Sequence, residues 1–302
     1  MGDPDLSRDG TRPSAGRVWA RRALAAVAAV VVLGAAGWAG AALLRDGDPP
    51  PPPTDTAPPL ARLRVIFPEG FTRAEMADRV AAVHEIAIRK RNVTPRLTRA
   101  GYAAATAASK PPVEFRKDWG GQSIEGFLFP ATYEFTQRTP SARLVRDQLA
   151  HFRGQWRRLD LRYAHSKNLT PYDVLIIASM IEKETVAPEE RNLVAAVIYN
   201  RLREGMPLGI DATIRYGRDV PGTEPLRQTD LESDDPYNTR NRLGLPPTPI
   251  ANPGLASLRA AAHPARVDHL YFVRKPDGVH HFFTASQSEF CQKSLEYGFG
   301  GC

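Results

Sequence analysis

Two glutamates stand at the end of a short apolar stretch, and their surroundings favour acid–base chemistry. Glu182 and Glu184 follow the run from Val174 to Ile181, which is almost entirely apolar. The negative end of a helix dipole and a dry neighbourhood both disfavour a carboxylate anion, so we expect a raised pKa. A raised pKa suits a general acid that works near neutral pH. A frayed and solvated helix end is the alternative interpretation.

These glutamates cannot form the opposed pair of carboxylates that hydrolysis of a glycosidic bond normally uses. Residues two apart on a helix project about 200° apart, so only one of the two can face a given cleft. A reaction that needs a single carboxylate would fit. Glu125, which stands before an aromatic stretch, is a possible second acid. Its alternative interpretation is a turn residue beside the site.

Two predicted helices meet at the glutamates. Thr170, Pro171 and Asp173 predict the start of the first helix, with a hydroxyl N-cap, a proline at the first position and an acid three residues after the cap. This helix should run to about Thr185 and should be buried on all sides, because its body is apolar around the whole circumference. A second helix follows, and Gly205 should close it.

Other chemistries find little support in the residue pattern. The histidines of the C-terminal part lack the spacing of zinc ligands; they are His263, His269, His280 and His281. Ser179 lacks the surroundings of a nucleophile elbow. We therefore expect no metal and no cofactor. The net charge of +7 would suit an anionic surface, but no nucleic-acid motif accompanies the basic runs, so nucleic acid is not an expected partner.

Eight sequence blocks follow one another between about residues 120 and 283: IEGFLFPATYEF, EKET, ERNLVAAVIYNRL, GMPLGIDATIRYG, DPYNTR, GLPPTPIANPG, AAAHPA and LYFV. In this order they resemble the endolytic murein transglycosylases, the MltG or YceG-like family. Two positions depart from the family pattern. Ala212 stands where proline is usual, and Arg240 replaces an aromatic residue.

The resemblance implies an enzyme that cuts nascent peptidoglycan strands between N-acetylmuramic acid and N-acetylglucosamine, which would terminate strand elongation. One carboxyl group protonates the leaving oxygen and then takes the proton of the C6 hydroxyl, which closes a 1,6-anhydro ring without water. The resemblance gives this role to Glu184. Glycan strands are the implied partner, with peptidoglycan synthases as further candidates. The residues expected to position substrate are Asp211, Thr213, Tyr216, Tyr237, Asn238 and Thr239.

Two other function classes remain open. A catalytically idle glycan-binding scaffold of the cell wall would use the same groove. A hydrolytic muramidase would need water and a second carboxylate, for which Asp211 and Glu125 are the candidates. Glu182 also remains a possible acid, because spacing alone does not choose between it and Glu184.

The N-terminal part predicts membrane attachment. Residues 1–22 form a polar tail with several arginines, and residues 23–44 form an uninterrupted apolar run that is long enough to span a bilayer. A cleaved signal peptide is the rival interpretation. The arginines place the N-terminus in the cytoplasm and everything after the span outside. Residues 45–59 are rich in proline and predict a stiff spacer.

The rest of the chain predicts an α+β protein. Residues 60–112 indicate a small α/β unit, in which Thr72 and Glu75 should form a capping box. In the family this position carries a LysM-like module, a type that binds N-acetylglucosamine polymers, and a packing spacer is the alternative. Residues 113–302 form the larger catalytic domain.

Local signals also organise the C-terminal part. Thr139 with Pro140 should cap an amphipathic helix, and Asn252 with Pro253 should cap a short one. Leu270 to Phe283 predicts a hairpin and Ser286 with Glu289 a final helix. The only cysteines, Cys291 and Cys302, should form a disulfide outside the cytoplasm.

Overall fold

The computed structural model describes residues 60–300. The predicted tail, membrane span and proline-rich spacer at residues 1–59 lie outside the described residues, and so does Cys302. The membrane orientation and the pairing of Cys291 with Cys302 therefore stay predictions. Within residues 60–300, no helix has the length and apolar character that crossing a membrane requires.

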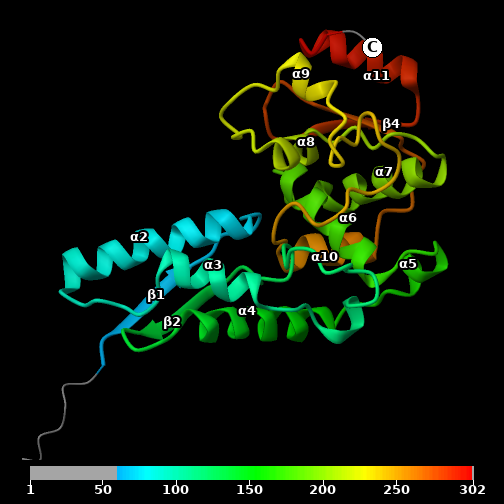
Figure 1. Ribbon diagram of the computed structural model, residues 1–302. Coiled ribbons are helices and arrows are strands. Elements are labelled where there is room, and N and C mark those ends of the chain that lie inside the picture. Colours follow the sequence, from blue (N-terminus) through cyan, green and yellow to red (C-terminus); the bar gives the residue numbers. More distant parts are fainter. Residues whose placement is uncertain (1–59, 301–302) are drawn as a thin grey trace, which may run out of the picture. The chain divides into compact units, whose positions relative to one another are not determined.

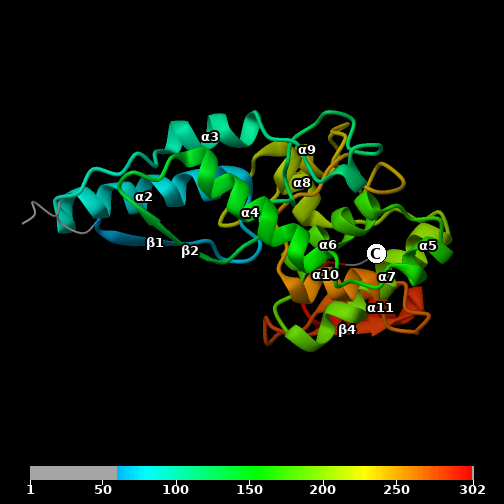
Figure 2. The ribbon, with the colours of Figure 1, turned by 90° about the horizontal axis from the view of Figure 1, so that it is seen from below.

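A strand–helix–helix–strand unit begins the described part (Figure 1). Its elements are β1 (Arg62–Ile66), α2 (Arg73–Arg91), α3 (Arg99–Ala107) and β2 (Thr132–Thr136). β1 and β2 pair antiparallel, with Leu63 opposite Phe135, and α2 packs against both β1 and α3 (Figure 2). The boundary expected at residue 112 lies inside this unit, because its two strands stand on opposite sides of that residue. Glycan binding by the unit stays a prediction.

The predicted capping box at the start of α2 is confirmed. Thr72 Oγ1 accepts a hydrogen bond from the backbone N–H of Glu75 at 3.2 Å, and Glu75 Oε2 accepts one from the backbone N–H of Thr72 at 2.6 Å. Met76 and Val80 then turn the apolar face of α2 into the core, where both are fully buried. The sequence thus placed the start of this helix correctly.

The central helix is α6 (Pro171–Glu184). Its predicted start is confirmed, because Thr170 and Asp173 form a capping box and Pro171 occupies the first position. Every residue from Val174 to Ile181 is buried, and the helix packs against α7 (Arg191–Arg203) and α10 (Leu255–Ala262). Each buried large apolar side chain stabilises the fold by about 1.5–3 kcal/mol, so α6 is fixed firmly.

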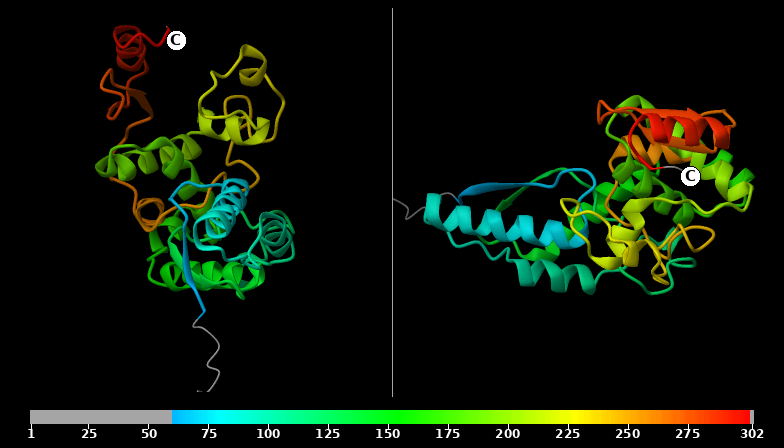
Figure 3. Two further views of the ribbon diagram at one scale, coloured as in Figure 1. Left: turned by 90° about the vertical axis from the view of Figure 1, so that its left-hand side faces the viewer. Right: turned by 90° about the horizontal axis from the view of Figure 1, so that it is seen from above.

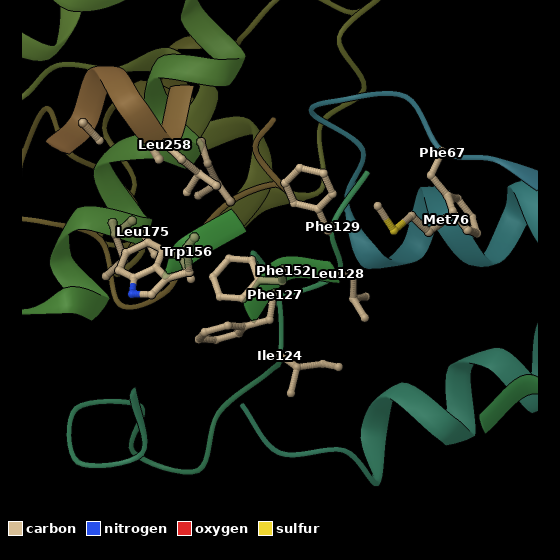
Figure 4. Packing of buried hydrophobic residues seen from close by; sticks show 14 of the residues in the cluster. Phe67, Met76, Ile124, Phe127, Leu128, Phe129, Phe152, Trp156, Leu175 and Leu258 are labelled. Carbon is tan, nitrogen blue, oxygen red and sulfur yellow. The ribbon is translucent and has the colours of Figure 1, made fainter. Parts of the chain in front are cut away.

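A cluster of aromatic side chains forms the core beside α6 (Figure 4). The ring of Phe127 meets that of Phe152 edge-on, with centroids 5.3 Å apart, and Phe152 stacks on Trp156 at 5.6 Å. Phe152 and Trp156 come from α4 (Ser141–Trp156). The predicted cap of α4 is wrong. Pro140 is the N-cap and gives no side-chain hydrogen bond, while Thr139 Oγ1 accepts from the backbone N–H of Thr136 instead.

Shorter elements complete the described part. They are η1 (Val113–Phe115), α5 (Arg162–Ser166), η2 (Pro188–Glu190), α8 (Asp211–Arg218), α9 (Gln228–Leu231), β3 (Tyr271–Arg274), β4 (His281–Thr284) and α11 (Gln287–Glu296). The predicted hairpin is confirmed as the antiparallel pair β3–β4, and Ser286 accepts from the Glu289 N–H at the start of α11. In the left panel of Figure 3, the hairpin with α11 and the α8–α9 segment stand apart as two projections.

The segment from residue 235 to residue 254 contains no strand, as its prolines predicted. The expected cap at its end is wrong, because Gly254 and not Asn252 is the N-cap of α10. Asn252 is fully buried instead, and its side chain bonds to the backbone of Phe71 and Leu128. The Asn252 amide therefore connects segments that are distant in sequence and does not cap the helix that follows. Residues 60–300 thus form a mixed α and β fold with two small two-stranded sheets.

Candidate active site

A pocket of about 1330 Å³ is lined by several segments of the chain that are far apart in sequence. Most of the lining comes from the N-terminus of α2, the end of α6, α8 with the loop after it, and the β3–β4 hairpin with α11, and the loop of Glu125, the end of α7 and the segment 235–254 also contribute. Five predicted site residues lie in its lining: Glu125, Glu184, Asp211, Tyr216 and Tyr237. The two other pockets described, of about 710 and 420 Å³, contain neither glutamate.

The two glutamates at the end of α6 face different surroundings. Glu184, the last residue of the helix, lines the pocket. Glu182 does not line it, and its Oε2 accepts a hydrogen bond of 2.9 Å from the backbone N–H of Gly254, the N-cap of α10. The helical geometry that separates residues two apart therefore gives Glu182 a structural contact and Glu184 the cavity.

The surroundings of Glu184 raise its pKa to about 7. Burial is the largest cause and the negative charge of Asp211 the second, while Arg274, the backbone N–H of Ala212 and Arg240 act in the opposite direction. The expected direction of the shift is thus confirmed. A carboxyl group with this pKa holds its proton in many of the molecules at neutral pH, so it can donate one to a bound substrate.

The rim beside Glu184 carries an ion pair. Arg240 Nη2 lies 2.7 Å from Asp211 Oδ1, and both side chains are about half exposed. Asp211 is also the first residue of α8, where the positive end of the helix dipole favours its negative charge. Arg240 thus stands at the rim of the pocket, where the family pattern led us to expect an aromatic ring.

Two tyrosines form part of the wall. The ring centroid of Tyr216 lies 5.1 Å from that of Tyr237, whose hydroxyl is 2.7 Å from Thr248 Oγ1. The Tyr216 hydroxyl donates to Glu125 Oε2 at 3.3 Å. These contacts hold two aromatic faces in the pocket wall, a surface suited to the apolar face of a sugar ring.

Three predicted site residues are buried behind the wall and do not line the pocket. Thr213 Oγ1 donates to the carbonyl of Ile210 at 2.7 Å and lies 3.0 Å from Thr239 Oγ1, which accepts from the Ile210 N–H. Asn238 Nδ2 donates to the carbonyls of Leu231 and Ser233. The two threonines therefore support the start of α8 and Asn238 supports the end of α9, and contact of these three side chains with substrate stays a prediction.

Sequence reasoning missed several pocket residues on the hairpin side. Phe290 of α11 stacks on Tyr271 with centroids 5.2 Å apart, and the guanidinium of Arg201 lies 5.3 Å from the Tyr271 ring. Arg274, at the end of β3, also lines the pocket. No local pattern marks these residues, because aromatic and basic side chains near a hairpin are common.

A buried contact between Glu190 and His281 fixes the hairpin. His281 Nδ1 lies 2.7 Å from Glu190 Oε2, and Glu190 Oε1 accepts from the backbone N–H of His281. His281 stands opposite Arg274 in the β3–β4 register, so this contact also fixes the backbone position of Arg274. The four histidines do not cluster with acids into a metal site: within the part of the chain that the structure describes, no group of three or more His, Cys, Asp or Glu could hold a metal ion.

Comparison with solved structures gives a similar fold. A YceG-like protein from Listeria monocytogenes, with a crystal structure at 2.6 Å, superposes with a TM-score of 0.62 and 27% sequence identity. The match covers 77% of this chain and 76% of the Listeria chain. The agreement thus extends over most of both chains.

Comparison of sequences gives the same result. An endolytic murein transglycosylase of Bacillus subtilis is 37% identical over 51% of this chain, and one of Streptococcus pneumoniae is 34% identical over 72% of it. The chain spans about two fifths of the length of these curated relatives, 43% and 41%. The sequence profile of the YceG-like family matches residues 43–295. This match covers most of the chain, which therefore belongs to the YceG-like family.

Proposed function

We propose that the chain is an endolytic lytic transglycosylase of peptidoglycan with Glu184 as its acid and base. One observation carries the proposal. The Glu184 carboxyl group, with a pKa of about 7, lines a large pocket at the position that the family resemblance assigns to the catalytic acid, and no side-chain donor among the described residues engages it. The names of the similar proteins from Bacillus and Streptococcus support the same reaction class.

In the proposed reaction, the proton of Glu184 passes to the glycosidic oxygen between N-acetylmuramic acid and N-acetylglucosamine. The bond from C1 to that oxygen breaks, and N-acetylglucosamine leaves with the proton. The Glu184 carboxylate then takes the proton of the C6 hydroxyl on the muramic residue while O6 bonds to C1. The products are a 1,6-anhydro end and a new N-acetylglucosamine end, and Glu184 regains its proton.

The neighbours of Glu184 prepare it for both steps. The N–H of Ala212 and the charge of Arg274 stabilise its anion after the first transfer, whereas burial and Asp211 keep the neutral acid populated before it. Tyr216, Tyr237 and Phe290 offer ring surfaces for the sugars. These opposing effects suit a group that must first give a proton and then recover one.

The two candidates for a second carboxylate, Asp211 and Glu125, are poorly placed to activate water, which argues against a hydrolytic muramidase. Asp211 is paired with Arg240. Glu125 is almost completely buried, and both its oxygens already accept hydrogen bonds from protein groups. A second general base needs a free lone pair that faces the substrate.

The deciding experiment is mass analysis of the products that the purified full chain releases from uncrosslinked glycan strands. We expect muramic ends that lack the mass of one water molecule, and internal cuts rather than release of single end units. Reducing muramic ends would indicate a muramidase. Binding of strands without any release would indicate a scaffold.

We further propose that the chain is anchored in the cell membrane by residues 23–44, with a cytoplasmic N-terminus and the pocket outside. The apolar run and the arginines before it support this placement. The enzyme would then cut nascent strands and end their elongation close to the synthases that make them. A reporter fused after Cys302 should be active only outside the cytoplasm. A soluble protein trimmed at its N-terminus would contradict the anchor.

A further inference from the structure

Glu125 is a buried acid that the proposed reaction does not use. It lies in the loop between η1 and β2, where its neighbours Ile124 and Phe127 point into the core (Figure 4). Its own side chain is 2% exposed and lines the same pocket as Glu184. The next residue, Gly126, has φ +88°, and a Cβ there would lie 2.7 Å from Pro249. The backbone beside Glu125 therefore has little freedom to move.

The contacts of Glu125 come from donors on three separate segments. Its Oε1 accepts from the backbone N–H of Arg73 at 2.9 Å and from Asn252 Nδ2 at 2.6 Å. Its Oε2 accepts from the Arg73 N–H at 3.0 Å and from the Tyr216 hydroxyl at 3.3 Å. A carboxylate suits this set, because a protonated acid or an amide would turn a donor of its own toward one of these groups.

Each donor belongs to an element that shapes the pocket. Arg73 is the first residue of α2, so its N–H points along the positive end of a long helix dipole. Asn252 also bonds to the carbonyl of Phe71, which fixes the loop before α2. Tyr216 lies on α8, the helix whose Ala212 N–H bonds to Glu184. The Glu125 carboxylate thus joins the start of α2 to the wall around Glu184.

We propose that Glu125 is a positioning residue for the active site and not a second acid: its carboxylate holds Tyr216 and the start of α2 in the geometry that the substrate requires. The proposal rests on the function proposed above, because the pocket must be the place of reaction. Protonation of Glu125 would remove an acceptor and loosen this wall. The rate should then rise with pH as Glu125 loses its proton.

The groups around Glu125 place this change near neutral pH. Burial raises its pKa to about 7, while the Arg73 N–H and charge, Asn252 and Tyr216 oppose the rise. Tyr102 of α3 and Tyr237 are the other ionisable groups that face it, and burial raises the pKa of both. They stay neutral in this range. Glu184 works as a protonated acid, so the reaction rate should fall as pH rises and Glu184 loses its proton. The rate therefore rises with pH as Glu125 ionises and falls with pH as Glu184 ionises, which gives a bell-shaped profile with its maximum near pH 7.

The test measures kcat and KM of the full chain on uncrosslinked glycan strands as a function of pH. In Glu125→Gln we expect kcat/KM to fall on the order of 10-fold to 100-fold, because the amide NH2 cannot accept the hydrogen bonds that a carboxylate oxygen accepts. The rising limb should disappear while the falling limb stays. Glu134→Gln is the matched control, since this exposed carboxylate of β2 lies outside the pocket. It should leave the profile unchanged.

Tyr216→Phe gives a second, milder readout if Glu125→Gln does not fold. It removes one donor that favours the Glu125 anion, so the rising limb should move to higher pH. A rising limb that persists in Glu125→Gln, or that stays in place in Tyr216→Phe, would overturn the proposal. Loss as complete as in Glu184→Gln would also overturn it, because Glu125 would then belong to the reacting groups.

The product identifies a failure of the proposed function separately. If the wild type releases reducing muramic ends, the transglycosylase mechanism fails, whatever the profile shows. The positioning role then still has its own readout in the binding of intact strands. In the Glu184→Gln background, Glu125→Gln should weaken binding by a further measurable factor if Glu125 shapes the wall. Equal binding by the single and double variants would contradict that role.

Discussion

Glu184 and Glu125 line the same pocket and have a similarly raised pKa, but the two regions around them differ. Glu125 sits among donors from Arg73, Asn252 and Tyr216, so both its oxygens are engaged. Glu184 receives one backbone N–H and stands beside the charge of Asp211. A raised pKa alone therefore does not identify a proton donor. A free lone pair toward the cavity distinguishes the reacting acid from the one that holds the wall.

Glu184→Gln should have the largest effect on activity. The amide keeps the size of the side chain but cannot donate the proton, so strand cleavage should fall by about 10²–10⁴-fold while the fold survives. Glu182→Gln is the matched control, since its amide oxygen can still accept from the Gly254 N–H. The rate of product release should be strongly reduced in Glu184→Gln and close to the wild-type rate in Glu182→Gln. Equal losses of activity in the two variants would contradict the assignment of Glu184 to the reaction and of Glu182 to a structural contact.

Asp211→Asn and Arg274→Gln should shift the pH profile in opposite directions. Asp211 raises the pKa of Glu184 and Arg274 lowers it. Because Glu184 acts in its protonated form, the falling limb should move to lower pH in Asp211→Asn and to higher pH in Arg274→Gln, on the order of one pH unit. The dependence of kcat/KM on pH checks this. Shifts in the same direction would show that another group controls that limb.

Glu184→Gln should also raise thermal stability. The folded pKa of about 7 lies above the ordinary value of 4.5, so the ionised form opposes folding, increasingly from pH 4.5 to pH 7 and constantly above. We expect a rise in Tm of a few degrees at pH 8 and a smaller rise at pH 5. Thermal unfolding of variant and wild type at both values tests the sign. A larger gain at pH 5 would contradict the raised pKa.

Thr213→Val should have the smallest effect and should concern stability alone. It removes a buried hydroxyl that donates to the Ile210 carbonyl, so the free energy of unfolding should fall by about 1 kcal/mol. KM should stay unchanged, because Thr213 does not line the pocket. Denaturant unfolding and steady-state kinetics give the two quantities. A raised KM with unchanged stability would restore the sugar contact that the sequence predicted.

Local signals made part of this structure predictable. The capping residues Thr72, Thr170 and Ser286 each bond to a backbone N–H within three residues, so the sequence contains the whole contact. The burial of α6 followed from its apolar circumference. The left-handed conformation that closes α7 fell on Gly205, the residue type that adopts it at least cost.

Contacts between distant segments were not predictable in the same way. Asn252 is of a residue type that often caps helices, but its side chain bonds to Glu125, Phe71 and Leu128. Thr213 and Asn238 carry groups that would suit a sugar, and the fold uses them for its own backbone. Hydroxyl and amide groups serve both purposes, so residue type does not decide between them. Only the placement of the backbone does.

The pairing of β1 with β2 also has a consequence for the growing chain. Within this unit β1 leaves the ribosome first, and both helices follow before its partner strand exists. Until β2 is synthesised, Leu63 and Val65 lack the partner strand that completes their side of the sheet. A contact so distant in sequence forms late and slowly. Synthesis that pauses soon after residue 112 would therefore leave an unpaired strand edge, and edges of this kind promote aggregation.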